Sequence, residues 1–155
     1  MTTDQQRALV HQCHERIKAR IRQHSWRSIS EEERHFENAL ALYGEIAGNG
    51  LVSIFFNSQY LGDMADELLD SLRAVDARKA AEVFGRSFAY FPGGKVPEGL
   101  NTRQKLLGRK GDDEFFDKLG EEFYARAEDC DAQLCGYILT HAAEFERLHG
   151  ASYRD

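Results

Sequence analysis

The stretch from Gly48 to Ser58 constrains the fold of this chain more than any other segment. Two glycines and an asparagine lead into a dense apolar run, and a second asparagine and a serine close it. Glycine gives the backbone freedom to reverse direction, while the apolar run needs burial. We therefore expect a helix that ends with Gly48 in the left-handed conformation, a tight reversal, a short buried segment and the start of the next helix.

Elsewhere the apolar residues recur with the spacing of helices, and no segment alternates as a half-buried strand does. Ser30 and Glu33 fit a capping box, in which each side chain bonds the backbone of the other. The spacing predicts an all-α, single compact domain of about seven to eight helices over residues 1–155. Helix starts are expected at Thr3 or Asp4, Ser30, Asp63, Asp76, Asn101 or Thr102, Asp112 or Asp113, and Asp131.

Three of these helices have predicted buried faces that can be checked directly. The buried face of the first helix is narrow, and that of the second helix is wider. We expect the last helix to run unbroken from near Asp131 past Phe145. A loop with both prolines and three glycines should separate the middle helices, over residues 91–99. The predicted faces are Leu9, Cys13, Ile17 and Ile21; Phe36, Leu40, Tyr43 and Ala47; and Leu134, Ile138, Ala142 and Phe145.

Length and composition indicate a single globular domain. A chain of 155 residues can bury a continuous core, and no apolar run approaches the ~18 residues needed to cross a membrane. No basic region leads into an apolar one near the N-terminus, so we expect a cytoplasmic protein. Three cysteines are an odd number for a disulfide framework, and we expect Cys13, Cys130 and Cys135 to be reduced.

The formal charge of −6 is unevenly distributed. Residues 1–29 hold six lysines and arginines against two carboxylates, a net charge of +4, so residues 30–155 carry −10. The acid is concentrated between Asp112 and Asp131, where nine carboxylates face only Lys118 and Arg126. Such a field repels nucleic acid and attracts basic protein surfaces. We expect no direct binding to nucleic acid or membrane.

Several motifs occur together in this order along residues 31–145, and the chain resembles a family of uncharacterised bacterial proteins that includes a DNA-mimic protein. The basic helix in residues 1–29 lies outside the resemblance. The resemblance implies a mostly helical fold, a homodimer and, for that member, an acidic surface that occupies the DNA-binding face of a transcriptional regulator. The motifs are Glu45, Asn49-Gly50, Phe55-Phe56-Asn57-Ser58, Gly62-Asp63, Phe91-Pro92-Gly93-Gly94, Val96-Pro97, Arg103, Phe116-Asp117, Leu119, Phe123-Tyr124 and Tyr137.

Residues that could carry chemistry lack the partners they would need. His11 and His14 lie three positions apart, so on a helix both side chains could bind one metal ion, but no second ligand pair follows. His141 and Glu144 could form an acid–base couple, but no nucleophile accompanies them. We therefore expect no catalytic residue, no metal and no cofactor, and we interpret Asn49, Gly50, Phe55, Phe56, Asn57, Gly62, Asp63, Pro92, Gly93 and Gly94 as architectural.

Two hypotheses for function remain. The first is a non-enzymatic interaction protein whose carboxylates bind a basic protein surface, as a DNA mimic acting on a DNA-binding regulator would. The alternative is a ligand-binding domain or enzyme with a pocket beside the Asn49-Gly50 turn, lined by Tyr43, Glu45 and Asn57. In the first hypothesis the binding residues are Asp112, Asp113, Glu114, Asp117, Glu121, Glu122, Glu128, Asp129 and Asp131.

Overall fold

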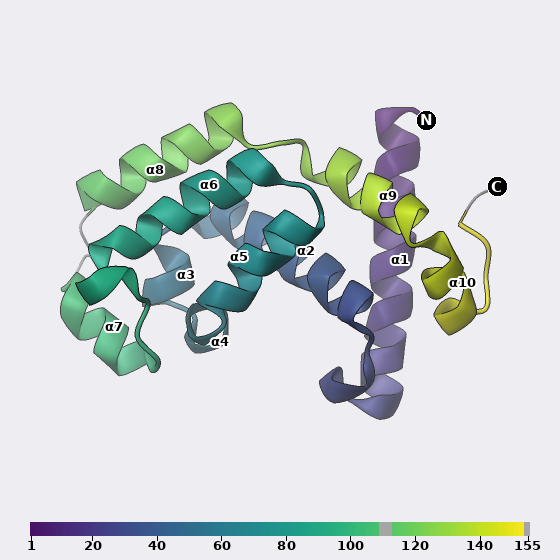
Figure 1. Cartoon of the computed structure of the whole chain (residues 1–155), viewed down its shortest axis with the longest axis horizontal. Coiled ribbons are helices and arrows are strands. Elements are labelled where there is room, and N and C mark those ends of the chain that lie inside the picture. Colours follow the sequence, from purple (N-terminus) through teal and green to yellow (C-terminus); the bar gives the residue numbers. More distant parts are fainter. Residues whose placement is uncertain (109–112, 154–155) are drawn as a thin grey trace.

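A computed structural model describes residues 1–108 and 113–153, and these residues form helices and connecting turns with no strand (Figure 1). The predicted all-α fold is confirmed, with eight α-helices of seven or more residues and two shorter ones in the described ranges. The α-helices are α1 (Thr3–His24), α2 (Glu31–Asn49), α3 (Ser53–Phe56), α4 (Gln59–Asp63), α5 (Ala65–Ala74), α6 (Arg78–Arg86), α7 (Leu100–Leu107), α8 (Asp113–Arg126), α9 (Cys130–Thr140) and α10 (Ala142–His149). Three 3-10 turns join them: η1 (Trp26–Ser28), η2 (Ser87–Tyr90) and η3 (Pro92–Gly94).

Helix α2 runs through the molecule and connects its two ends (Figure 1). At one end α1 packs across α9, with α10 beside them. Toward the other end α2 packs on α5, α5 packs on α6, and α6 packs on α8. The short helices α3 and α4 both contact α7 there. No helix of the described residues is long and apolar enough to span a bilayer.

Local capping signals set the starts of the two longest helices. The predicted capping box of α2 is confirmed, because Ser30 Oγ accepts the Glu33 amide at 3.1 Å and Glu33 Oε2 accepts the Ser30 amide at 2.8 Å. The cap of α1 is Thr2 rather than Thr3 or Asp4. Thr2 makes a second capping box with Gln5, whose side chain can return the bond from the third helical position.

The reversal after α2 forms as predicted, but two residues later than expected. Helix α2 continues to Asn49, and the residue with positive φ is Gly50 at 81°, so the prediction for Gly48 is wrong. The Gly50 amide still donates to the carbonyl of Ile46, whose buried side chain keeps the last turn helical. Leu51 is then buried, and α3 follows as the short buried segment.

The buried face of α2 is rotated from the predicted one. Phe36 is buried as expected, but Leu40 and Tyr43 are half-buried and Ala47 is exposed. The packing of α2 on α5 explains the rotation, because it buries the side that carries Asn38, whose amide donates to Ser71 Oγ at 3.1 Å. The fully buried apolar residues of α2 are Phe36, Ala39, Leu42 and Ile46.

Asp63 and Asp76 do not cap the helices that follow them. Asp63 is the last residue of α4, and its carboxylate binds Arg103 instead. Asp76 has a φ of 60° and pairs with Arg78 at 2.6 Å, so its side chain does not reach the free amides of α6. A tertiary contact engages Asp63, and a local ion pair engages Asp76, so neither side chain makes the cap that the sequence suggested.

The predicted last helix is two helices. The backbone breaks at His141, with φ −104° and ψ 20°, which ends α9 and begins α10. The His141 ring lies 4.4 Å from the Tyr137 ring at this break. The predicted apolar face survives it, since all four of its residues are buried: Leu134, Ile138, Ala142 and Phe145.

Phe55 on α3 is the centre of the aromatic core. Its ring contacts the ring of Phe91 at 5.2 Å and that of Phe116 at 5.7 Å, and it also meets two phenylalanines from α6 and η2. Edge and stacked contacts of this kind stabilise beyond burial alone. Because Phe116 lies on the inner face of α8, the same cluster fixes which face of α8 points to solvent.

Candidate protein-binding surface

A buried arginine organises the family-like motifs around α3, α4 and α7. The Arg103 side chain is fully buried, which is costly for a cation unless every donor is satisfied. Its Nη1 donates to Asp63 Oδ1 at 2.5 Å and to the Pro97 carbonyl at 3.0 Å. Its Nε and Nη2 donate to three further carbonyls, those of Phe55, Ser58 and Gln59.

Gly62 and Asp63 are explained by this arginine. A Cβ on Gly62 would lie 2.4 Å from the guanidinium of Arg103, so only glycine fits there. Asp63 Oδ1 also accepts the Gly99 amide at 2.7 Å. These bonds, that of Arg103 foremost, hold the pKa of the Asp63 carboxyl below its usual value of 3.8. The architectural interpretation of both residues rests on these contacts.

The Asn49-Gly50 turn contains a chain of hydrogen bonds. Glu45 Oε1 accepts from Asn49 Nδ2 at 3.2 Å and from the Ser53 hydroxyl, and Asn57 Nδ2 donates to Ser53 Oγ at 3.0 Å. These polar groups satisfy one another. The groove described below and four further hollows of the described residues are lined by other side chains.

The turn after the aromatic core uses two glycines. Gly93 and Gly94 have φ values of 68° and 67°, a conformation that side chains with a Cβ disfavour. Together with Pro92 they turn the chain so that Phe91 is buried and Pro97 reaches Arg103. Phe56 is half-buried, and its carbonyl accepts a hydrogen bond from Gln104 Nε2 at 2.8 Å.

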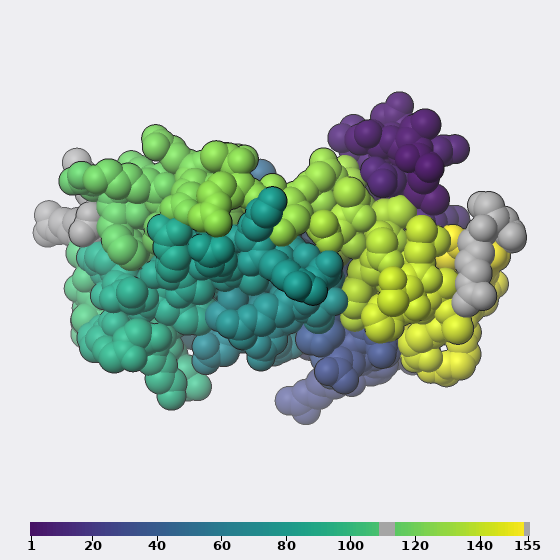
Figure 2. All heavy atoms as spheres, turned by 45° about the horizontal axis from the view of Figure 1, so that its top comes forward, coloured from purple at the N-terminus to yellow at the C-terminus, as the bar shows by residue number. Residues whose placement is uncertain are grey.

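The outer face of α8 carries a row of carboxylates. Phe116, Leu119 and Phe123 are buried on the inner face, as predicted. Glu114, Asp117 and Glu121 are exposed. They have the spacing i, i+3, i+7, which places them along one side of the helix at about 5 Å per charge. This is the same order as the ~3.4 Å between successive charges on one DNA strand. Figure 2 shows α8, in green, as an exposed ridge along the molecule.

Ion pairs neutralise part of this row. Glu114 pairs with Lys118 at 2.8 Å, and Glu122 accepts two bonds from Arg86, at 2.6 and 2.7 Å, and another from Arg126. The bonds from Arg86, foremost, and from Arg126 lower the pKa of Glu122 to about 2. Asp117 and Glu121 have no ion-pair partner among the described residues. Among the described side chains of α8, they are therefore the carboxylates without an ion pair.

The three carboxylates after α8 have structural partners. Glu128 accepts the amides of Lys79 and Ala80 at 2.9 and 3.1 Å, so it caps α6 from a distant part of the chain. Asp129 accepts the Ala132 amide at 2.8 Å and caps α9, and Asp131 pairs with Arg7 at 3.2 Å. Asp112 lies outside the described residues, and of Asp113 the structure describes only its place as the first residue of α8.

Sequence reasoning missed a buried network that ties the two ends of the chain together. Glu33 Oε1 accepts from Arg20 Nε and from His149 Nε2, both at 2.9 Å, and His149 Nδ1 lies 2.5 Å from the Tyr153 hydroxyl. Glu33 and His149 both have fully buried side chains. Because Glu33 and His149 lie 116 positions apart, no local sequence pattern indicates that they interact. The capping box pointed only to Glu33.

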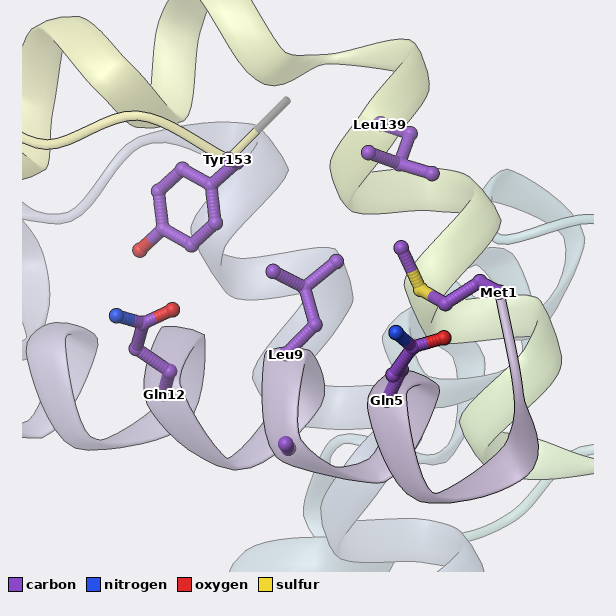
Figure 3. A pocket seen from close by; sticks show the side chains of 7 residues that line it. Met1, Gln5, Leu9, Gln12, Leu139 and Tyr153 are labelled. Carbon is purple, nitrogen blue, oxygen red and sulfur yellow. The ribbon is translucent and has the colours of Figure 1, made fainter. Parts of the chain in front are cut away.

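A groove of about 830 Å³ lies between α1 and α9 (Figure 3). Leu9 and Leu139 line it from the two helices, with Tyr153 at its far end, and Gln5 and Gln12 lie along its α1 side. Met1 and Ala8 complete the lining. None of these side chains is charged, and the groove is separate from the α8 row.

The three cysteines are free thiols. Burial raises the pKa of Cys13 and of Cys130 to about 12, so both remain protonated at neutral pH and are poor nucleophiles. Cys135 is buried against Met1, with 3.4 Å between the sulfur atoms. Within the described ranges, His, Cys, Asp and Glu side chains form no group of three that could hold a metal.

Comparison with known proteins identifies the family. Residues 27–141 match a family model described as DMP19-like protein, which confirms the resemblance, seen in the motifs, to a family that includes a DNA-mimic protein. The match starts after α1 and stops before α10, the two helices joined by the Glu33 network. No curated protein and no solved structure matches the chain. By the match over residues 27–141, the chain belongs to the DMP19-like protein family.

Proposed function

We propose that this protein is a non-enzymatic interaction protein whose acidic face binds a basic protein surface, as a DNA mimic acting on a DNA-binding regulator. We define the acidic face as Glu114, Asp117 and Glu121 on α8. The observation that carries the proposal is the pair of free carboxylates, Asp117 and Glu121, on the exposed side of a helix whose other side is fixed in the core.

Rigidity supports this role. A mimic must present its charges in a fixed array, because ordering them on binding would cost conformational entropy. Helix α8 meets this need through Phe116 in the aromatic cluster and through Glu122, which Arg86 binds with two bonds. The ion pair of Glu122 with Arg86, which lies next to the acidic face, therefore anchors the helix, and Asp117 and Glu121 stay unpaired.

Membership of a family named for a DNA mimic supports the nature of the partner. A basic surface that has evolved to bind DNA neutralises regularly spaced phosphates with lysine and arginine. The acidic face offers charges at a comparable linear spacing, and carboxylates form strong bonds with guanidinium groups. The resulting complex should weaken as salt is raised.

Affinity capture tests the proposal. The immobilised full chain is exposed to a lysate of the cells that produce it, and the captured proteins are identified by mass spectrometry. We expect a basic, DNA-binding protein, and we expect duplex DNA to compete for it once it is purified. The chain itself should not bind duplex DNA. Capture of no such protein, or a captured protein whose binding duplex DNA leaves unchanged, would contradict mimicry.

A charge-matched control makes the capture specific. The variant Asp117→Asn/Glu121→Gln should lose the partner. The variant Asp66→Asn/Glu98→Gln removes the same two charges from exposed positions elsewhere, and it should retain the partner. Equal loss in both variants would mean that net charge, and not the acidic face, determines binding.

A further inference from the structure

The end of α1 and the η1 turn carry a basic and aromatic patch. We define this patch as Arg22, His24, Trp26, Arg27 and Tyr60. The rings of Trp26 on η1 and Tyr60 on α4 meet edge to face, with 6.3 Å between their centroids, and Tyr60 is 52% exposed. Tryptophan, tyrosine and arginine are the residues most enriched among the strong contacts of protein interfaces. The patch therefore has the composition of a binding surface.

The chain does not neutralise the positive charge of the patch. Residues 16–30 contain no aspartate and no glutamate. Arg22 and Arg27 are exposed, and neither makes an ion pair or a side-chain hydrogen bond within residues 1–108 and 113–153. The other three lysines and arginines of residues 16–30 each have a carboxylate or an aromatic ring as their partner. The two arginines of the patch are thus available to an anionic ligand.

A turn held by hydrogen bonds positions Trp26. The backbone of Ser25 has a φ of 112°, a conformation that residues with a Cβ seldom adopt. The Ser25 amide donates to the Ile21 carbonyl at 2.9 Å, and the Ser28 hydroxyl donates to the Ser25 carbonyl at 2.7 Å, so the turn is fixed on both sides. Because these residues are already ordered, a ligand that binds there loses little affinity to conformational entropy.

Glu67 limits where the charges of an anionic ligand can lie. Burial, and then the charge of Glu67, raises the pKa of the Tyr60 hydroxyl, so this carboxylate acts on the Tyr60 side of the patch. A ligand carboxylate near Glu67 would be repelled, whereas an apolar side chain on the two rings would not. The patch therefore suits a ligand that has carboxylates at the arginines and an apolar group at the rings.

From this arrangement we infer that the patch binds an acidic segment of a second protein, with its carboxylates on the two arginines and an apolar side chain on the rings of Trp26 and Tyr60. Guanidinium groups form strong, charge-assisted bonds with carboxylates. An extended polyanion such as nucleic acid would also meet the −10 charge of residues 30–155. A short acidic segment contacts the patch alone, and salt screens more distant charges beyond about 8 Å.

The patch and the acidic face of α8 are separate surfaces. Figure 1 shows α8 along one edge of the molecule and the end of α1, from which η1 continues, on the opposite side. The chain can therefore hold two proteins at once, a basic one at α8 and an acidic one at the patch. The inference does not rest on the proposed function, because the two surfaces share no residue.

The fluorescence of Trp26 tests the inference, because Trp26 is the only tryptophan of the chain. The probe is a short synthetic peptide in which glutamates flank one phenylalanine, and glutamines replace the glutamates in the control peptide. We expect the acidic peptide to change the fluorescence in a saturable way that weakens as salt is raised. The control peptide, a single-stranded oligonucleotide and vesicles of phosphatidylglycerol should leave the fluorescence unchanged.

Matched variants locate the binding to the patch. The variant Arg22→Gln/Arg27→Gln should bind the acidic peptide roughly tenfold more weakly than the parent, because both charged contacts are lost. The variant Tyr60→Ala should also bind it more weakly, since it removes one of the two rings. The variant Lys95→Gln/Lys105→Gln removes two positive charges from exposed positions elsewhere, and it should bind as the parent does.

Three results would overturn the inference: no saturable change with the acidic peptide, equal binding by the parent and Arg22→Gln/Arg27→Gln, or a response to the oligonucleotide or the vesicles that equals the response to the peptide. Circular dichroism confirms that each variant is folded. The variant Asp117→Asn/Glu121→Gln should bind the peptide at least as tightly as the parent. Failure of the proposed function would therefore leave the peptide results unchanged.

Discussion

The guanidinium of Arg103 and the carboxylate of Asp63 meet at 2.5 Å, although the two residues lie 40 positions apart. This contact joins α7 to α4, and four backbone carbonyls surround the same guanidinium. A buried charge is tolerated only with such complete pairing. The motifs around the contact therefore maintain the fold that presents α8.

Substitution of Gly62 tests this arrangement. The variant Gly62→Ala should lower the free energy of unfolding by roughly 1–3 kcal/mol, because the new Cβ must displace the Arg103 guanidinium. The variant Gly44→Ala is the control, since a Cβ at Gly44 meets nothing within 4 Å and the site is in the interior of α2. It should stabilise by about 0.5–1 kcal/mol. Urea melts of both variants check the opposite signs, and equal effects would argue against the arginine cage.

Truncation of Phe55 tests the aromatic core. The variant Phe55→Ala should cost about 3–5 kcal/mol, because the cavity would adjoin four other phenylalanine rings. The variant Phe56→Ala should cost less, since Phe56 is half-buried. Denaturant midpoints measure both. If the parent and Phe55→Ala had the same midpoint, α3 would be peripheral.

Substitution of Glu128 distinguishes carboxylates that stabilise the fold from carboxylates that we propose to bind the partner. The variant Glu128→Gln should lose about 0.5–2 kcal/mol of stability, because the charged cap of α6 is replaced by a neutral amide. The variant Glu121→Gln removes an exposed charge with no ion-pair partner among the described residues, and it should change stability by less than about 0.5 kcal/mol. Thermal melts distinguish the two. A stable Glu128→Gln variant would show that α6 does not need this cap.

Acid stability should depend on Glu33. Burial acts to raise its pKa, but the bonds from His149 and Ser30 and the charge of Arg20 hold that pKa below the usual 4.5. A lowered pKa in the folded state means stability that is present above about pH 4.5 and is lost as the pH falls further. Melts across this range should show a loss that Glu33→Gln makes shallower.

Glu37 provides a control of opposite sign. Burial raises the pKa of Glu37, despite its bond to His14 at 2.8 Å, so its protonation at low pH favours the folded state. The variant Glu37→Gln should therefore steepen the acid loss. If both variants changed the pH profile in the same direction, the network around Glu33 would not be the cause of the loss of stability in acid.

The features that the sequence predicts correctly depend on residues that lie close together in the chain. The capping box of Ser30 and Glu33 was predictable because its two members lie three positions apart. The inner face of α8 was predictable because helical spacing alone places Phe116 and Phe123 on one side. Gly48 was chosen wrongly over Gly50 because both glycines suit a helix end, and the buried Ile46 decided which turn stayed helical.

Distant contacts could not be predicted from spacing. Asp63 looked like a helix cap until Arg103 engaged it, and Glu128 looked like a free charge although it caps α6. The same limit applies to the binding surface. Composition identified the acidic segment, but only the tertiary structure separates Asp117 and Glu121 from the carboxylates that hold helices together.

The rate of partner association against salt tests the central claim most directly. With the captured partner immobilised, Asp117→Asn/Glu121→Gln should bind more slowly than the parent at low salt, by roughly tenfold, because steering by a charged face acts on the association rate. The difference should shrink as salt is raised, and urea melts should show unchanged stability. If the parent and this variant associate equally fast at low salt, the acidic face of α8 is not the binding surface.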